Sequence, residues 1–71
     1  MLTLADLFIS PIGEPVEVEG LFMGLCVEPV IIKKFQHGTK RCHFEVTYHG
    51  VSLGAIEITR TNGSSYSYRR L

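Results

Sequence analysis

The chain has little of what would assign it to a common class of secreted or membrane protein. It has only two cysteines, Cys26 and Cys42, which are too few for a disulfide framework. A single bridge is possible, but a reduced pair in an intracellular protein is the better expectation. No apolar run approaches the roughly 18 residues of a transmembrane helix. The N-terminus lacks the basic region and cleavage site of a signal peptide. We therefore expect a cytoplasmic protein without a membrane partner.

The sequence also lacks a net charge and any catalytic motif. Seven Lys and Arg balance seven Asp and Glu, which argues against a free-standing, nonspecific nucleic-acid binder. It contains no glycine-rich phosphate loop, nucleophile elbow or His-Glu-x-x-His sequence. Cys42 and His43 are neighbours in a predicted strand, so they point to opposite faces and cannot hold one metal ion together. We expect a non-catalytic protein with no metal and no cofactor.

What the chain does have is charge separated along its length. Residues 1–32 contain five carboxylates and no Lys or Arg, for a net charge of −5, whereas residues 33–71 carry +5. The two halves can pair within one molecule, associate between molecules, or present a basic face to an anionic partner. Pairing within the molecule and ordinary solvation are the favoured interpretations.

Residues 40–61 predict a β-hairpin around which the rest of the chain is organised. Apolar side chains recur at every second position from Cys42 to Tyr48, which is typical of a strand with one buried face. His49-Gly50 forms a two-residue turn in which Gly50 takes a positive φ. The apolar phase then changes near Gly54, which predicts one extra residue there.

This extra residue fixes the expected register of the hairpin. The predicted pairs are Tyr48 with Val51, Val46 with Leu53, Phe44 with Ile56, and Cys42 with Ile58. A similar phase change at Gly20 predicts a second bend. Two bent strands favour a small curled antiparallel sheet or barrel.

The whole chain, residues 1–71, therefore predicts a single, mainly β domain of about five strands with a short N-terminal helix. The helix is expected at 3–9, with Thr3 as its N-cap and Asp6 completing a capping box. The expected strands are 15–26, 30–35, 40–48, 51–61 and 64–71, and the turn after the second strand is expected at 36–39.

The register of the last hairpin has two alternatives. A type I′ turn at Asn62-Gly63 sets Tyr66 and Tyr68 opposite Thr59 and Glu57, on the solvated face. A three-residue loop ending in Gly63 instead sets the two tyrosines beside Ile58 and Ile56. We favour the second alternative because a small core gains from two aromatic rings.

The strongest candidate site is a basic hairpin tip spanning residues 33–41, where an aromatic ring lies among cations. Such a surface can bind phosphates and stack a base. The alternative is a solvated turn whose lysines protect an edge strand from aggregation. The candidate contacts are Lys33, Lys34, Phe35, His37, Lys40 and Arg41, with Arg60, Arg69 and Arg70 as secondary basic residues.

A second candidate surface is the apolar face of the short helix, formed by Leu4, Leu7 and Phe8. A helix this short needs tertiary packing, so its apolar face covers the sheet or docks a partner, and the first is favoured. The chain is 45% hydrophobic, which predicts leftover apolar surface on so small a domain.

These observations predict a small binding module rather than an enzyme. We expect a protein–protein interaction subunit, adaptor or inhibitor, with a protein partner or self-association. The alternative is a nucleic-acid-binding module that uses residues 33–41. A homo-oligomer joined through the edges of the sheet is a third interpretation.

Overall fold

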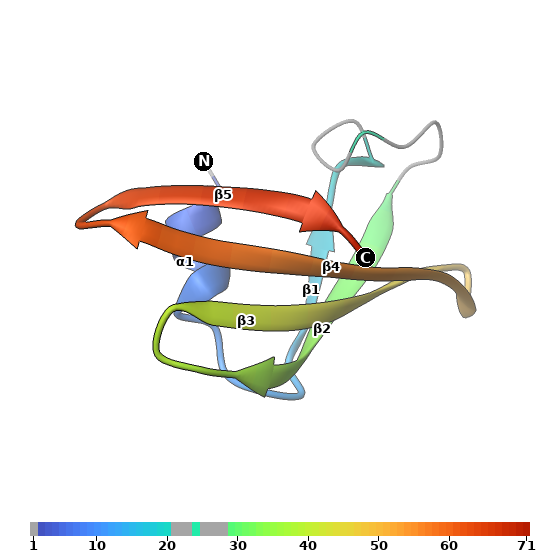
Figure 1. Cartoon of the computed structure of the whole chain (residues 1–71). Coiled ribbons are helices and arrows are strands. Elements are labelled where there is room, and N and C mark those ends of the chain that lie inside the picture. The colour runs from blue at the N-terminus through green and yellow to red at the C-terminus, as the bar shows by residue number, and fades with distance from the viewer. Residues whose placement is uncertain (1, 21–23, 25–28) are drawn as a thin grey trace.

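The computed structural model describes residues 2–20, 24 and 29–71. Five strands form one antiparallel sheet in which each strand pairs with the next along the chain, in the order β1-β2-β3-β4-β5 (Figure 1). The sheet curls without closing into a barrel. The predicted mainly β fold with a short N-terminal helix is confirmed. The elements are α1 (Leu4–Phe8), β1 (Pro15–Val18), β2 (Val30–His37), β3 (Arg41–Tyr48), β4 (Val51–Asn62) and β5 (Ser65–Arg70).

Helix α1 begins with the predicted capping box. The Thr3 hydroxyl accepts a hydrogen bond from the Asp6 backbone N–H at 3.2 Å. The Asp6 carboxylate accepts one from the Thr3 N–H at 2.9 Å. These two bonds satisfy N–H groups that a helix N-terminus otherwise leaves unpaired. The helix has only five residues, and it is held against the inner face of the sheet, where it contacts β4 and β5.

The core lies between α1 and the inner face of the sheet. Leu7 and Phe8 are buried in it, and Leu4 packs against it from a partly exposed position. The favoured expectation, that the apolar face of the helix covers the chain's own sheet, is therefore confirmed for Leu7 and Phe8. The alternative, a docking face, is wrong for Leu7, which is fully buried. The buried apolar side chains are Leu7, Phe8, Val18, Val30, Ile32, Cys42, Phe44, Val46, Ile56 and Ile58.

The β3–β4 hairpin has the predicted turn and the predicted extra residue. His49 and Gly50 both have positive φ, at 48° and 80°. The pairs Tyr48–Val51, Phe44–Ile56 and Cys42–Ile58 are confirmed, but Val46 lies opposite Gly54 rather than Leu53. Leu53 is thus the bulged residue, and it packs against the core. Gly54 follows it with φ at 115°, a value that L side chains rarely adopt.

The β4–β5 hairpin adopts neither predicted register. Tyr68 lies opposite Ile58 and Tyr66 opposite Arg60, with the ladder shifted between Arg60 and Asn62. The tyrosines share the inner face with Ile58, as the favoured alternative expected, but two residues further along β4. The turn lies at Gly63-Ser64 instead of ending at Gly63, which moves the pairing by two residues. The bulge between Arg60 and Asn62 keeps the tyrosines on the inner face.

Two predicted strand boundaries change by two residues or more, and the others change by at most one residue. Strand β1 ends at Val18, so the predicted strand 15–26 is too long at residues 19, 20 and 24, while 21–23, 25 and 26 lie outside the described residues. Strand β2 continues to His37, because a bulge between Lys34 and Gln36 carries the ladder two residues beyond the predicted end. The connecting turn is accordingly residues 38–40.

Candidate functional site

Lys34 is not a surface residue of the basic tip, which corrects the sequence prediction. It follows Val30 and Ile32 on the inward positions of β2, and only 1% of it is exposed. Its Nζ donates to the carbonyl oxygens of Phe8 and Ser10, both at 2.6 Å. It also lies 3.0 Å from His37 Nδ1. Lys34 therefore fastens the end of α1 to the sheet.

The surroundings of Lys34 shift its protonation equilibrium. Burial lowers the pKa of Lys34 from its ordinary 10.5, while the charge of the Cys42 thiolate acts in the opposite direction. Burial in turn raises the pKa of the Cys42 thiol. The Lys34 ammonium also lies 5.9 Å from the centre of the Phe8 ring and 5.5 Å from that of Phe44. Ring faces and carbonyl oxygens thus compensate part of the cost of burying this charge.

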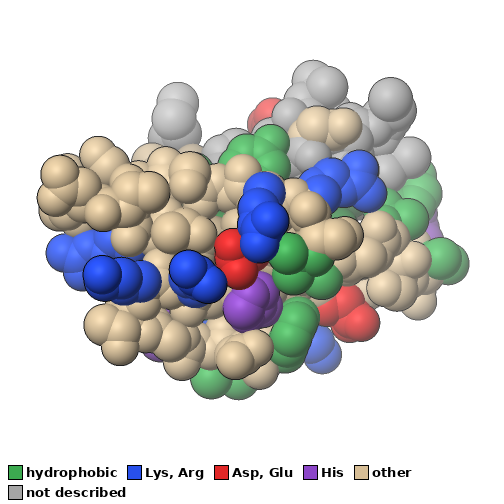
Figure 2. All heavy atoms as spheres, viewed as in Figure 1, with side chains coloured by type: hydrophobic (Ala, Val, Ile, Leu, Met, Phe, Trp, Pro, Cys, Tyr) green, Lys and Arg blue, Asp and Glu red, His purple; other side chains and the backbone are tan. Residues whose placement is uncertain are grey.

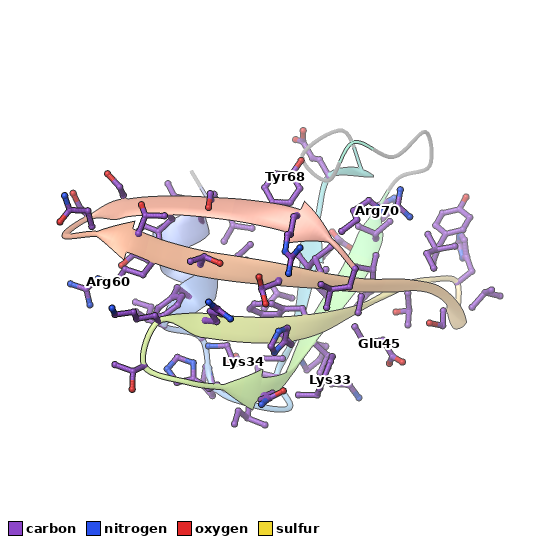
Figure 3. All side chains as sticks on the ribbon, in the orientation of Figure 1. Lys33, Lys34, Glu45, Arg60, Tyr68 and Arg70 are labelled. Atoms are coloured by element: carbon purple, nitrogen blue, oxygen red, sulfur yellow. The ribbon has the colours of Figure 1, made fainter. Side chains whose placement is uncertain are left out.

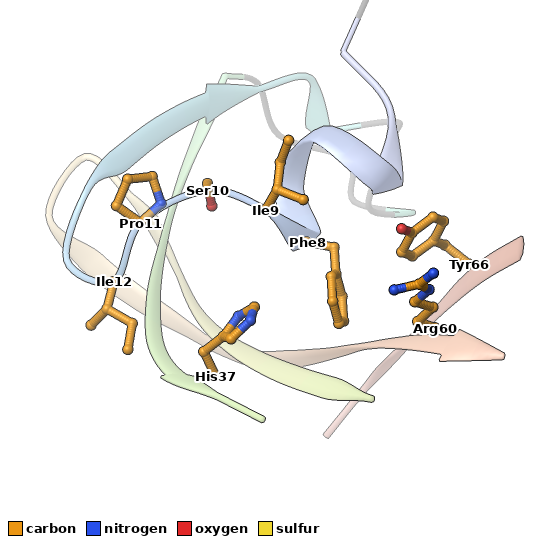
Figure 4. A pocket seen from close by; sticks show the side chains of 8 residues that line it. All are labelled: Phe8, Ile9, Ser10, Pro11, Ile12, His37, Arg60 and Tyr66. Atoms are coloured by element: carbon orange, nitrogen blue, oxygen red, sulfur yellow. The ribbon is translucent and has the colours of Figure 1, made fainter. Parts of the chain in front are cut away.

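An open groove of about 560 Å³ is lined in part by Phe8, Ser10 and His37, the three residues that Lys34 Nζ contacts (Figure 4). One wall comes from the segment that joins α1 to β1, and the other from the ends of β2, β4 and β5. Figure 4 shows Phe8 between His37 on one side and Arg60 with Tyr66 on the other. We call this the α1 groove; its lining residues are Phe8, Ile9, Ser10, Pro11, Ile12, His37, Arg60 and Tyr66.

The α1 groove has an unusually exposed aliphatic rim. Ile9 is 74% exposed and Ile12 is 61% exposed. The floor is aromatic: the Phe8 ring lies 5.3 Å from the His37 ring and 5.4 Å from the Tyr66 ring, both in tilted arrangements. Exposed aliphatic side chains beside fixed aromatic rings are typical of a docking surface.

Arg60 joins the α1 groove to the neighbouring hairpin ends. Its Nε donates to the Gly63 carbonyl at 2.7 Å, and its backbone N–H donates to the Lys40 carbonyl at 2.8 Å. Arg60 and Lys40 also line one shallow hollow between the β2–β3 and β4–β5 turns. Lys and Arg side chains gather at this end of the molecule in Figure 2. The structure therefore brings Arg60 close to Lys40, as the basic-tip prediction requires.

The outer face of the sheet carries a second arrangement of rings and charges. Phe35 is 55% exposed, and its ring stacks on that of His43 with centres 6.1 Å apart. His43 Nε2 lies 2.9 Å from the Glu57 carboxylate, which also accepts a 3.0 Å bond from Arg69 Nε. The His43 hydrogen bond, and after it that of Arg69, lowers the pKa of Glu57. Arg69 is thus engaged by a carboxylate, which makes it a weaker contact for a phosphate.

The remaining predicted contacts are distributed over the molecule. Lys33, His37 and Arg41 are exposed, and Lys33 lies opposite Glu45 in the β2–β3 ladder. Arg70 lies near the end of β5, at the opposite end of the β4–β5 hairpin from Arg60, as Figure 3 shows, and donates to the Leu53 carbonyl at 3.5 Å. The nine predicted basic-tip and secondary residues therefore do not form one surface.

Sequence reasoning missed the α1 groove. Ile9 and Ile12 flank Ser10-Pro11, in a stretch that the sequence identifies only as the end of a helix and a loop. Tyr66 was expected to fill the core, and Arg60 was only a secondary candidate. The available signal was a pair of large aliphatic side chains in a Pro- and Gly-containing loop, where no strand or helix buries them.

Within the described part of the chain, no cluster of three His, Cys, Asp or Glu residues has the geometry to hold a metal ion. None of the helices described is long and apolar enough to cross a membrane. Comparison with protein-family models, characterised proteins and solved structures finds no match to this chain.

Proposed function

We propose that this protein is a non-catalytic interaction module of the cytoplasm that docks a protein partner in the α1 groove. The observation that carries the proposal is the rim of the groove, where Ile9 and Ile12 are more than half exposed. Among the described residues, no element covers these two side chains. An exposed aliphatic rim over an aromatic floor gains free energy when a partner's side chains displace water from it.

The local structure also supports a preformed binding surface. The Lys34 hydrogen bonds hold two backbone carbonyls of the groove wall, at Phe8 and Ser10. The hydrogen bond from Gly13 N–H to the Lys34 carbonyl, at 2.9 Å, holds the same segment at its other end. A wall fixed at both ends loses little conformational entropy on binding, which favours affinity.

The test is affinity purification from the native cell, with and without nuclease, using three forms of the full chain. The groove variant is Ile9→Ser with Ile12→Ser. The matched control is Val51→Ser, which changes an aliphatic residue with similar exposure, 62%, on β4 away from the groove. We expect one protein to be retained by the wild type and the control and lost by the groove variant, whether or not nuclease is present.

The same experiment can contradict the proposal in two ways. A partner that binds the groove variant as well as the wild type docks elsewhere on the molecule. A partner that is lost after nuclease treatment is tethered by nucleic acid. Denaturation curves for all three forms establish that each one is folded before the comparison is made.

A second candidate function, nucleic-acid binding, is favoured by the exposed Phe35 ring. The Phe35 ring, which stacks on His43, can support a base of a nucleic acid. Lys33 and Arg41 are exposed on the same two strands and can contact the phosphates of its backbone. Lys40 and Arg60 extend this surface around the hairpin ends. Lys34 has no part in it because it is buried.

Salt dependence separates this candidate from the first. Phosphate contacts release counterions, so the logarithm of the affinity for a single-stranded oligonucleotide should fall linearly with the logarithm of salt concentration. Lys40→Ala with Arg41→Ala should reduce that slope. Phe35→Ala should weaken binding and leave the slope unchanged, because the ring carries no charge. Binding that is unchanged in both variants would exclude this surface.

A further inference from the structure

The α1 groove places polar donors on two facing sides of its apolar floor. Arg60 stands on the β4 side and His37 on the β2 side, with the Phe8 ring between them (Figure 4). The Arg60 guanidinium uses its Nε–H on the Gly63 carbonyl, which leaves its two terminal nitrogens for a ligand. Its planar terminal nitrogens match the geometry of a carboxylate.

Lys34 determines which nitrogen of His37 can donate. An ammonium group has three protons and no acceptor, and Lys34 Nζ has three partners: the Phe8 carbonyl, the Ser10 carbonyl and His37 Nδ1. With Lys34 charged, Nδ1 must be the acceptor of the third bond. The proton of the neutral imidazole then resides on Nε2, which becomes a donor in a side chain that lines the groove.

The described lining of the groove contains no carboxylate that would neutralise these donors. None of the described residues that line it is an Asp or a Glu. Lys40, which shares a hollow with Arg60, adds a further positive charge next to the groove. The site therefore combines an aliphatic rim, an aromatic floor and an uncompensated positive charge, and its complement is a ligand that is apolar and anionic at once.

Building on the proposed function, we propose that the α1 groove selects an acidic side chain, Asp or Glu, flanked by an aliphatic residue within a peptide segment of the partner protein. The carboxylate binds the terminal nitrogens of the Arg60 guanidinium, and His37 Nε2–H, on the other side of the Phe8 ring, donates to a second acceptor of the peptide. The neighbouring aliphatic side chain packs against Ile9, Ile12 and the Phe8 ring. Charge-assisted donors in a partly apolar site contribute both affinity and orientation.

The test is a selection of random 12-residue peptides displayed at the N-terminus of a phage coat protein. In this format each peptide is fused at its C-terminal end, so a free terminal carboxylate is absent and only acidic side chains can supply the anion. The selection is run on the wild type, on Arg60→Gln, and on Arg70→Gln as the matched control on the far end of β5. We expect the wild type and the control to enrich peptides with an acidic residue next to an aliphatic one, and Arg60→Gln to lose the acidic preference.

The selected peptide then gives a quantitative check. Replacing its acidic residue with Gln or Asn should weaken binding to the wild type about tenfold or more. The same replacement should have little effect on binding to Arg60→Gln, because the two changes remove one interaction. The replacements in the peptide are measured on the wild-type chain, so they test the preference for an acidic side chain even if Arg60→Gln does not fold. In addition, ¹⁵N spectra of the His37 ring should show the Nε2–H form.

The outcomes distinguish the ligand class from the docking site. Aliphatic peptides selected without an acidic preference would overturn this inference but keep the groove as a docking surface. Peptides that bind the Ile9→Ser, Ile12→Ser variant equally well would overturn the proposed function itself. Self-association of the wild type that Arg60→Gln abolishes would assign the groove to a second copy of the chain instead of a partner peptide.

Discussion

At the scale of single residues, Lys34 links the core to the surface. Its alternation with Val30 and Ile32 along β2 is visible in the sequence and places it on the inner face. The sequence does not show that two backbone carbonyls accept hydrogen bonds from Lys34 there, because these carbonyls belong to a helix end about 25 positions earlier in the chain. Hydrogen-bond partners so distant in sequence are supplied by tertiary packing alone.

Lys34→Ala should lower the free energy of unfolding by about 2–4 kcal/mol, because it leaves the Phe8 and Ser10 carbonyls without a donor and opens a cavity. That is a large share of the stability of a small domain. Urea denaturation measures the effect. Lys33→Ala, at the exposed neighbouring position, should stay within about 0.5 kcal/mol of the wild type. Equal stability of the two variants would show that the buried hydrogen bonds contribute nothing.

Glu57 should make the stability of the protein sensitive to acid. Its pKa is lowered in the folded state, so its contribution is complete above the ordinary value of 4.5 and is lost as the pH falls through the lower folded value. Glu57→Gln should therefore remove part of the stability loss that the wild type shows on acidification.

Denaturation midpoints measured at a series of acidic pH values check this prediction. His43→Gln and Arg69→Gln should each remove part of the acid sensitivity, because hydrogen bonds from both side chains lower the pKa of Glu57. An acid sensitivity that neither variant changes would mean that Glu57 is not its source.

At the scale of elements, the β3–β4 hairpin depends on its bulge. Gly54 has φ at 115°, and a Cβ placed on it would meet no atom within 4 Å. Gly54→Ala should therefore destabilise the protein through backbone strain and not through a steric clash, by about 1–3 kcal/mol. The urea midpoint measures this effect. Val51→Ala, an exposed change on the same strand, should shift the stability by no more than about 0.5 kcal/mol.

Most elements could be predicted from the sequence because their signals are local. The capping box at Thr3, the His49-Gly50 turn and the phase change at Gly54 each involve residues within a few positions of one another. The last hairpin was misplaced because its turn lies at Gly63-Ser64 and a bulge lies between Arg60 and Asn62, and the local sequence reveals neither.

The α1 groove could not be predicted in the same way. Its walls come from the helix end, β2, β4 and β5, so it exists only once the sheet has curled around α1. The periodicity of the sequence says which residues point inward along a strand, but not which strand ends meet. The predicted basic tip failed for Lys34 because two adjacent lysines on a strand necessarily face opposite sides.

At the scale of the whole molecule, the separation of charge persists in the fold. Asp6, Glu14, Glu17 and Glu19 form no ion pair with Lys or Arg within the ranges 2–20, 24 and 29–71. The ion pairs described there join only residues of the basic half, at His43, Glu57 and Arg69. The exposed carboxylates of the N-terminal part and the exposed Lys and Arg side chains of the later strands are thus both available for association between molecules.

We therefore expect the protein to self-associate weakly at low ionic strength. Sedimentation at about 20 mM salt should give a larger average mass than at about 500 mM, because added salt screens the attraction between oppositely charged surfaces. Glu17→Gln with Glu19→Gln should reduce the difference. A mass that does not change with salt would show that the separated charges do not join copies of the chain.

The strand order has a consequence for how the chain acquires its structure. Every ladder joins strands that are consecutive in sequence, so the sheet has low contact order and can form by successive local steps. Helix α1 is the exception, since it precedes the strands in the sequence and rests on β4 and β5, the last two strands of the sheet. Until those two strands have paired, the sheet cannot shelter Leu7 and Phe8. The closing event of folding is therefore the meeting of the helix with the last hairpin.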